Sequence, residues 1–430
     1  MIIKLRNDLI INFDEIIENE FYIFDNFQLK FNKISIPIEF KQYIELLIVG
    51  IEYKENLFFI NSKLLDVHID INNLTNVVLE LDKYFLLENI KSSNKLIELN
   101  NYSKLINRPN ICEDILYSSD EPKFIRDISH ILKQKKLDIK INFKSDFNLI
   151  FAPHLDYYSN QNVTEAYANI FNYISDLEYD LVVYLGTAHF VNSSLFMLCD
   201  KNYSTPLNNT FTDNELINNI LDDCSKALNN KDVAFDKSEV NEIEKYIKID
   251  NLAHKDEHSI ELHNTFISFL NKESQINILP ILTGSFDEKL DQNIYDTLMD
   301  IIKNNIKAKY KKVLFLSSGD MSHIGVKFGD LSNKNDNLNE IKDNKNYYNF
   351  KKDNYINFEK EVIKTFIDND LNQYKTIMFK KNKDFRICGF APFYSGLYFF
   401  PGLKGTLIDH YYTENLNEEF LVSYTTMIFT

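Results

Sequence analysis

The chain has 430 residues, of which 44% are hydrophobic and 26% charged, which gives apolar material for two or three packed domains and excludes a disordered chain. Its 47 basic and 63 acidic residues give a net charge of −16, and this charge repels nucleic acid phosphates and anionic membrane surfaces. We therefore expect no nucleic-acid partner and no membrane partner.

Targeting and membrane segments are not expected either. Five acidic residues interrupt the first 20 positions, which a cleavable signal segment would not tolerate, so we expect a cytoplasmic protein. The uncharged apolar stretch 387–403 is too short and too rich in glycine and proline to span a bilayer. The cysteines lack paired spacing and are predicted to be free thiols; they are Cys112, Cys199, Cys224 and Cys388.

Residues 1–105 are predicted to form a small α+β domain, because short apolar runs alternate with Asn and Asp residues. A helix is expected over 38–49, ended by Gly50, and another near 76–85. Two strands followed by helices resemble the winged-helix-like peptide-binding domains found beside radical-enzyme maturation systems. The alternative is an extension that packs on the main domain.

Residues 106–430 are predicted to form an α/β domain, in which a mixed or parallel central sheet is flanked by helices. From about residue 145 buried strands alternate with helices, and a capping box at Thr212 and Glu215 starts one helix. The predicted strands are 147–152, 180–185 (ended by Gly186), 276–282 and 312–317, and the predicted helices begin near 162, 216 and 259. The Asn- and Lys-rich stretch 332–349 is expected to be an exposed loop.

Ionisable side chains follow three of these strands. His154 comes after the first strand, His189 after the second, and Asp320 and His323 after the strand that ends near 317. Ligands of open α/β sheets bind in the crevice beyond the carboxyl ends of the strands. We therefore expect these residues to line a ligand site.

Five segments in order resemble the motifs of the Memo family: Ala152–Tyr157, Leu185–His189, Asp256–His263, Ser317–His323 and Ile387–Pro392. Upstream, Arg108–Pro109 and Leu116–Asp120 are similar to the opening segment of that family, so the resemblance covers 108–430. Bacterial and archaeal relatives are commonly named AmmeMemoRadiSam system protein B, which implies radical SAM and AMMECR-type partner proteins.

The resemblance implies a fold related to the class III extradiol dioxygenases, in which two histidines and a carboxylate hold ferrous iron. Memo proteins carry a cysteine in place of the carboxylate. His154 and His189 would then be the imidazole ligands of the metal and Cys388 the thiolate, with Asp320 and His323 in the same pocket. Two imidazoles and one thiolate suit a single divalent metal ion, with iron(II) favoured and copper or zinc possible.

Some residues near these ligands have more than one interpretation. Asp156 stands where the family usually has glycine, and it could be a further ligand, a carboxylate that orients His154, or a helix cap. Thr187–Ala188 stands where Pro-Ser is common. A bound cation and the helix that begins near 391 would lower the pKa of Cys388, although this residue could also be a small buried hydrophobe.

The segment 256–263 superficially resembles a zinc-binding helix. His258 and His263 are five residues apart, about 500° of helical rotation, so their rings cannot share a metal as in metalloproteases that use an i, i+4 pair. We expect Glu257 and His258 to face the pocket, Glu261 to cap the first turn of the helix, and His263 to pack locally.

The predicted function is that of a mononuclear non-heme metal oxidoreductase, dioxygenase-like, with a small or peptidyl substrate and with His323, Asp320 and His258 as catalytic candidates. Ionisable groups beyond the ligands favour catalysis. The alternative is a non-catalytic protein that binds a peptide or sequesters a redox metal, which the cysteine-for-carboxylate exchange favours. A zinc hydrolase is a weaker third interpretation.

Overall fold

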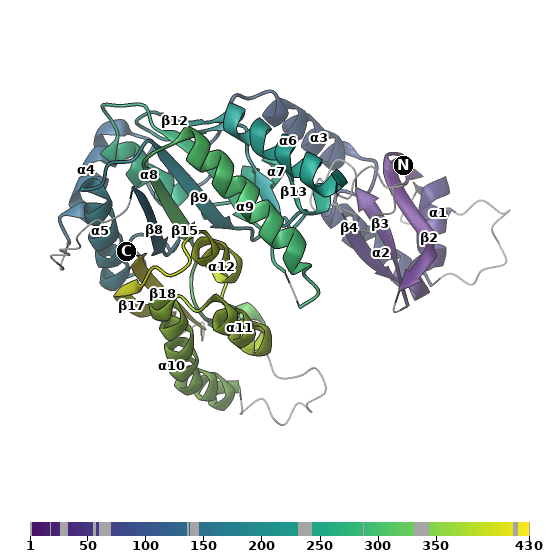
Figure 1. Cartoon of the computed structure of the whole chain (residues 1–430). Helices are drawn as coiled ribbons and strands as arrows, with labels where there is room; N and C mark the ends of the chain where they lie inside the picture. The colour runs from purple at the N-terminus through teal and green to yellow at the C-terminus, as the bar shows by residue number, and fades with distance from the viewer. Residues whose placement is uncertain are drawn as a thin grey trace. The chain divides into compact units, whose positions relative to one another are not determined.

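The computed structural model describes residues 2–17, 19–25, 33–54, 57–59, 70–135, 137, 146–230, 243–286, 288–330, 344–415 and 420–429. The chain forms two compact units, Met1–Leu105 and Ile106–Thr430, which are described separately (Figure 1). Among the described residues, no helix is both long and apolar enough to cross a membrane.

Among its described residues, the first unit contains two antiparallel sheets and three α-helices. One sheet has the order β1 (Ile2–Ile3), β5 (Ile51–Lys54), β6 (Leu57–Phe59), and the other β2 (Leu9–Ile17), β3 (Glu20–Asp25), β4 (Lys33–Pro37). The helices are η1 (Ile38–Phe40), α1 (Lys41–Val49), α2 (Ile71–Lys83) and α3 (Ile90–Ser103). Four strands precede the first helix where we expected two, and the winged-helix-like arrangement stays a prediction.

Local signals explain where these helices begin and end. Gly50 directly follows α1 and ends it, as predicted. Its φ is +97°, a backbone conformation that residues with a side chain rarely adopt. The second helix begins earlier than predicted, because the Asp70 carboxylate accepts hydrogen bonds from the backbone N–H groups of Asn72 and Asn73.

The second unit is built on a mixed sheet, as predicted. Its main path is β16 (His323–Gly325), β18 (Phe420–Phe429), β8 (Phe147–Ala152), β15 (Val313–Ser318), β9 (Leu181–Thr187), β14 (Asn277–Thr283), β12 (Asn209–Thr212), β11 (Asn202–Ser204), β7 (Asn107–Arg108). β8, β15, β9 and β14 are parallel neighbours, whereas β18 is antiparallel to β8. Further strands are β10 (Phe196–Leu198), β13 (Ile247–Ile249) and β17 (Gly405–Asn415).

Helices cover both faces of this sheet (Figure 1). They are α4 (Glu121–Leu132), α5 (Gln161–Ser175), α6 (Asn214–Asn230), η3 (Ile243–Lys245), α7 (Asn251–Lys255), α8 (Glu261–Leu270), α9 (Gln292–Lys309), η4 (Val326–Phe328), α10 (Asn344–Asp368), α11 (Leu371–Phe385) and α12 (Phe390–Phe399). The side chains of successive strand residues point to opposite faces of the sheet. Leu149 packs with α9 and α12 on one face, and Ile150 packs with α5 and α8 on the other. The central strands are therefore mostly apolar on both faces.

Two details of this unit differ from the sequence-based prediction. Gly186 lies inside β9 instead of ending it, and a Cβ atom there would be 2.7 Å from Cγ1 of Ile260, so glycine lets the segment before α8 pack on the strand. The α6 helix is capped by Asp213, whose carboxylate accepts from Leu216 N at 3.0 Å. The predicted cap Thr212 instead donates its hydroxyl to a backbone carbonyl.

The predicted loop 332–349 lies mostly outside the described residues. Its last part, from residue 344, belongs to α10 and is helical, which corrects the prediction for that part.

Candidate metal centre

The candidate ligands come from the carboxyl ends of three parallel strands. His154 lies two residues beyond β8, His189 two beyond β9 and Asp320 two beyond β15. The register places Ser318, the end of β15, opposite Ala152 on one side and Gly186 on the other. The three side chains therefore emerge side by side at one edge of the sheet.

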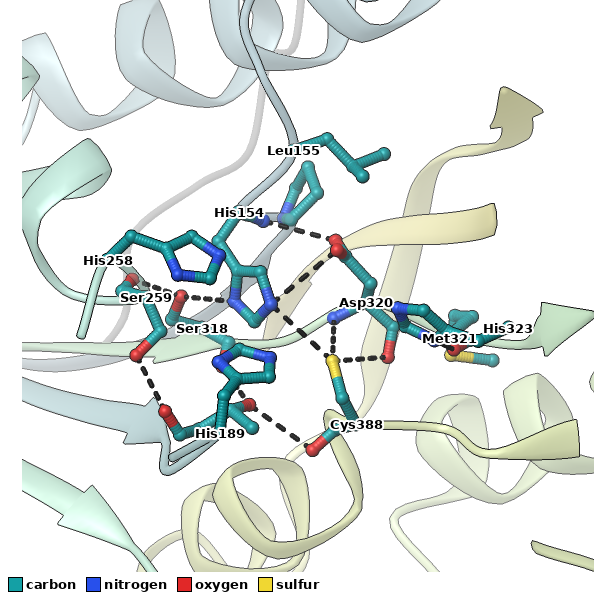
Figure 2. Close-up of polar contacts among 12 residues, drawn as sticks. His154, Leu155, His189, His258, Ser259, Ser318, Asp320, Met321, His323 and Cys388 are labelled. Carbon is teal, nitrogen blue, oxygen red and sulfur yellow. Dashed lines mark hydrogen bonds and ion pairs between the residues drawn. The ribbon is translucent and has the colours of Figure 1, made fainter. Parts of the chain in front are cut away.

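Two further residues from loops complete the cluster. His258 precedes α8, and Cys388 lies between α11 and α12. Figure 2 shows His154 in the middle, with His258 and His189 on one side and Asp320 and Cys388 on the other. The five potential donors thus gather around His154, although they come from five distant stretches of sequence.

Distances within the cluster define two overlapping groups of potential ligand atoms. Nε2 of His154 is 3.4 Å from Sγ of Cys388 and 3.5 Å from Oδ2 of Asp320. Ligand atoms within 4.8 Å of one another form two groups that share His154, one with Asp320 and Cys388 and one with His189 and His258. The predicted set of His154, His189 and Cys388 is thus divided between two overlapping groups.

Ser318 orients the His154 ring. The Ser318 hydroxyl donates to the carbonyl of Ser259, which leaves its oxygen as the acceptor for Nδ1 of His154 at 3.1 Å. This assignment puts the ring proton on Nδ1 and leaves a lone pair on Nε2, the nitrogen that faces Cys388 and Asp320. The free lone pair of His154 therefore points toward Cys388 and Asp320.

Glu257 performs the same task for His189. Its buried carboxylate accepts from the backbone N of His189 at 2.8 Å and from Nδ1 at 2.9 Å, and Nδ1 of His258 lies 3.3 Å away. The rings of His189 and His258 are stacked, with centroids 4.9 Å apart. Because Nδ1 is engaged, Nε2 of His189 is the nitrogen available to a metal. Glu257 and His258 thus lie beside His189, and their predicted position facing a substrate pocket stays a prediction.

Burial and neighbouring charge perturb the titration of these groups. Burial raises the pKa of Asp320 to about 7, raises that of the Cys388 thiol, and lowers that of His154. Burial opposes the charge on His189, yet hydrogen bonds with Cys388 and Glu257 raise its pKa to about 11. The predicted lowering of the Cys388 pKa is therefore absent from the protein alone and would require a bound cation.

The Asp320 and Cys388 loops pack closely against each other. A Cβ atom on Gly319 would lie 2.3 Å from Cα of Gly389, so only glycine permits this approach. Gly389 N donates to the carbonyl of Asp320 at 3.0 Å, and Asp320 N donates to Sγ of Cys388 at 3.2 Å. The two loops are thus fixed relative to each other.

His323 is oriented away from this cluster. Its Nδ1 lies 3.0 Å from the carbonyl oxygens of both Met321 and Arg386, and Figure 2 shows its ring on the far side of Asp320 from His154. Burial lowers the pKa of His323 to about 4. Of the three catalytic candidates, Asp320 and His258 lie in the cluster and His323 lies beside it.

The geometry corrects two other predictions. Asp156 is exposed and its carboxylate accepts from Tyr158 N at 3.0 Å, a local turn contact, while Asn160 caps the following helix. Glu261 does not cap α8; it accepts hydrogen bonds from the segment that follows β7. His263 packs locally as expected, with Nε2 2.6 Å from the carbonyl of Pro153.

Glu261 belongs to a buried ion pair with Arg108. The guanidinium is 2.6 Å from the Glu261 carboxylate, and it also donates to the carbonyls of His254 and Glu257, each at 2.6 Å. The other Glu261 contacts are with Ile111 N, Cys112 N and Tyr117 Oη. This cluster ties the opening motif to the segment that carries Glu257. Sequence analysis missed the pairing, although both residues lie in the quoted motifs.

Comparison with known proteins places this site in a family. The sequence profile of the Memo-like protein family matches residues 114–428. The chain belongs to the Memo-like family. A MEMO1 family protein of Aquifex aeolicus is 28% identical over 181 residues, which cover 42% of this chain and 41% of the relative.

Two archaeal relatives are also similar to this Memo-like chain. A MEMO1 family protein of Methanosarcina mazei is 27% identical over 173 residues (40% of this chain, 52% of the relative). One of Methanococcoides burtonii is 35% identical over 80 residues (18% and 27%). The matched stretches span about half or less of the length of these relatives.

In this Memo-like protein a cavity of about 710 Å³ reaches Cys388 from outside the cluster. Aromatic and aliphatic side chains form much of its wall, and the described cationic residues beside it are Lys289, Lys383 and Arg386. The Phe286 and Phe390 rings are in contact there, with centroids 4.9 Å apart. A second cavity of about 530 Å³ shares Ser285, Phe286 and Lys289 with the first.

Proposed function

We propose that this Memo-like protein binds one divalent metal ion through His154, His189 and Cys388, with iron(II) favoured and copper or zinc as alternatives. The observation that carries the proposal is the fixed orientation of both imidazoles, whose Nδ1 atoms are held by Ser318 and Glu257. Two imidazoles and a thiolate suit these ions, and hydrogen bonds of this kind tune such ligands.

The neighbouring donors extend this proposed ligand set. Oδ2 of Asp320 lies 3.5 Å from Nε2 of His154, and the backbone N of Asp320 lies 3.2 Å from Sγ of Cys388. The Asp320 carboxylate is therefore available as a further ligand. His258 is close to the other side of the cluster, with its ring 5.2 Å from that of His154.

We propose that the bound ion serves a mononuclear non-heme oxidoreductase reaction on a small or peptidyl substrate. An ion in this site would supply Lewis acidity and, for iron or copper, a redox couple with open coordination positions. Asp320, with a pKa raised to about 7 by burial, can hold or release a proton near neutral pH. His258 is the second candidate for acid–base work, because it is partly exposed and adjoins His189.

The cavity beside Cys388 is the proposed position for the apolar part of the substrate. Its wall includes Phe286, Phe379, Ile387 and Phe390. Substrate pockets are commonly concave and mostly apolar with a few polar groups, and this cavity has the size of a small-molecule site.

The partners and the location of the protein are separate proposals, which rest on the family resemblance. We propose a cytoplasmic protein that works with radical SAM and AMMECR-type proteins. Affinity capture with the full chain and with a chain lacking 1–105 tests whether the first unit recruits them. Equal recovery of both partner types by the two chains would assign recruitment to the second unit.

Metal analysis after anaerobic purification tests the proposed function. We expect about one equivalent of metal in the wild type and loss of tight binding in His154→Ala and His189→Ala, with unchanged circular dichroism. His130→Gln is the control, since this exposed histidine lies on α4, which carries no residue of the cluster, and it should retain metal. Full metal occupancy in both alanine variants would contradict the assignment. Metal binding without consumption of an oxidant would favour a sequestering or peptide-binding role.

A further inference from the structure

A buried carboxylate from a distant helix contacts the loop that carries Asp320. Glu359, on α10, is fully buried, and its Oε1 accepts from the backbone N of Ser322 at 2.9 Å. The same oxygen accepts a hydrogen bond from the Ser423 hydroxyl on β18. Oε2 lies 2.6 Å from Nε2 of His410 on β17. Glu359 therefore joins three elements to one loop.

Backbone hydrogen bonds extend this connection toward the metal centre. Met321 N donates to the carbonyl of Ser423 at 2.8 Å, and Ser423 N donates to the carbonyl of Ser322 at 3.0 Å. At its other end the loop is held by Gly389, whose N donates to the carbonyl of Asp320 at 3.0 Å. The loop that carries Asp320 is thus fixed between β18 with Glu359 on one side and the Cys388 loop on the other.

The Glu359 carboxylate has a further hydrogen-bond partner at this depth. A buried polar group without such a partner is unfavourable. His410 supplies it, and the His410 side chain is 22% exposed. An imidazole at the surface of β17 is thereby connected through Glu359 to the peptide two residues from Asp320.

We propose that Glu359, paired with His410, is a positioning residue of the metal centre. By binding Ser322 N and Ser423 Oγ, it sets the path of the 320–323 loop and so the direction of the Asp320 carboxylate and its approach to Cys388. This inference rests on the proposed metal-binding function, because the effect of the pair on the ligands is what makes it more than a structural contact.

Glutamine at position 359 separates this role from simple packing. A carboxylate can accept from all three donors, namely Ser322 N, Ser423 Oγ and the His410 imidazole, whereas an amide has only one acceptor oxygen. Glu359→Gln keeps the volume of the side chain but replaces the carboxylate by a neutral amide. The hydrogen bonds from Ser322 N and Ser423 Oγ then lose their charge-assisted strength, so the loop is held less firmly.

Cobalt(II) is the probe for the test, because its visible absorption spectrum reports ligand geometry. The metal-free full chain and its Glu359→Gln variant are titrated with Co(II), and affinity, spectrum and free energy of unfolding are measured for each. Glu414→Gln is the matched control: Glu414 pairs with Lys352 at 2.6 Å, which joins the same α10 and β17 without contact to the loop. His410→Gln is a second variant that leaves the carboxylate in place.

We expect Glu359→Gln to weaken Co(II) binding about tenfold or more and to alter the spectrum, as residues that orient metal ligands typically do. His410→Gln should shift both readouts in the same direction by less, and Glu414→Gln should bind Co(II) like the wild type. If Glu359→Gln does not fold, the His410→Gln result decides.

Two outcomes would overturn the inference, and only the second would also overturn the proposed metal-binding function. If the folded Glu359→Gln and His410→Gln variants bind Co(II) with the affinity and spectrum of the wild type and are only less stable, the Glu359–His410 pair is purely structural. The proposed function would then stay intact. Failure of the wild type itself to bind Co(II) would overturn the proposed function and this inference with it.

Discussion

Glu257 binds His189 twice, through the backbone N at 2.8 Å and the ring Nδ1 at 2.9 Å, so one buried carboxylate fixes both the main chain and the ring of a candidate ligand. Burial would raise the pKa of Glu257, but the hydrogen bonds and charge of His189 lower it to about 2. The pair is therefore ionised in the metal-free protein, and a metal ion would replace the proton on Nε2 of His189.

Glu257→Gln should weaken metal binding about 10- to 100-fold, because the amide can no longer serve as an anionic acceptor for the His189 ring. Competition titration with a chelator of known affinity measures the effect. Asp156→Asn is the control, since this exposed carboxylate contacts only the local turn among its described hydrogen bonds. Equal metal affinity in Glu257→Gln and the wild type would show that this carboxylate does not support a ligand.

Cys388 should be alkylated slowly at neutral pH with or without metal, but for different reasons. In the metal-free protein burial raises the pKa of the thiol, and in the loaded protein the metal covers the sulfur. At a pH above the range in which thiols ordinarily ionise, the metal-free thiol should therefore react, while the loaded thiol stays protected. Cys199 and Cys224, whose pKa values burial raises to about 12, are internal controls without metal dependence. Equal alkylation rates of Cys388 with and without metal at high pH would exclude Cys388 as a ligand.

Cys388→Asp should retain iron(II) binding and lose preference for softer metals, because a carboxylate is an ordinary third ligand for iron(II) beside two histidines. Paired titrations with Fe(II) and Cu(I) under argon measure the change in preference. An unchanged ratio of the two affinities would mean that the sulfur does not contact the metal.

Arg108→Met should lower the free energy of unfolding of the second unit by about 3–5 kcal/mol, because Glu261 would then be a buried charge without its cation. Arg108 and Glu261 are both almost fully buried, with 1% of each side chain exposed. Urea denaturation followed by circular dichroism measures the loss. Breaking the exposed Lys123–Asp127 pair by Asp127→Asn should cost less than about 1 kcal/mol. A similar small loss in Arg108→Met would show that the buried pair contributes little.

Stability should fall as the pH drops from about 6.5 toward 4, because burial lowers the pKa of His263 to about 4. The unfolded chain, with an ordinary histidine pKa near 6.5, takes up the proton first, so the stabilisation is complete above 6.5 and is lost through this window. The loss from His263 is on the order of 3 kcal/mol. His263→Gln should flatten the pH dependence of the unfolding free energy, and His130→Gln, at an exposed helix position, should not. Equal slopes in wild type and His263→Gln would contradict this account.

The sheet edge that carries the site could be predicted because both faces of the sheet are covered. β8, β9 and β15 therefore read as continuous apolar runs, and the predicted strand 147–152 has the bounds of β8. Since parallel strands end at one edge, residues just beyond them had to meet. The position of His154 beside His189 and Asp320 follows from that rule.

Directions of side chains outside the strands could not be predicted in the same way. Asp156 is two residues from His154, yet the turn at 156–159 directs its carboxylate to Tyr158 N. Glu359 is one acidic residue among many charged ones on α10, and its partner His410 follows 51 residues later. Such pairings depend on how distant elements pack, which no local pattern encodes.

X-ray absorption of the protein loaded with one equivalent of Zn(II) tests the proposed metal centre most directly. We expect one sulfur scatterer at about 2.3 Å from the zinc and two imidazole nitrogens at about 2.0 Å, with the sulfur lost in Cys388→Ala. A first shell of nitrogen and oxygen alone in the wild type would contradict a centre built on His154, His189 and Cys388.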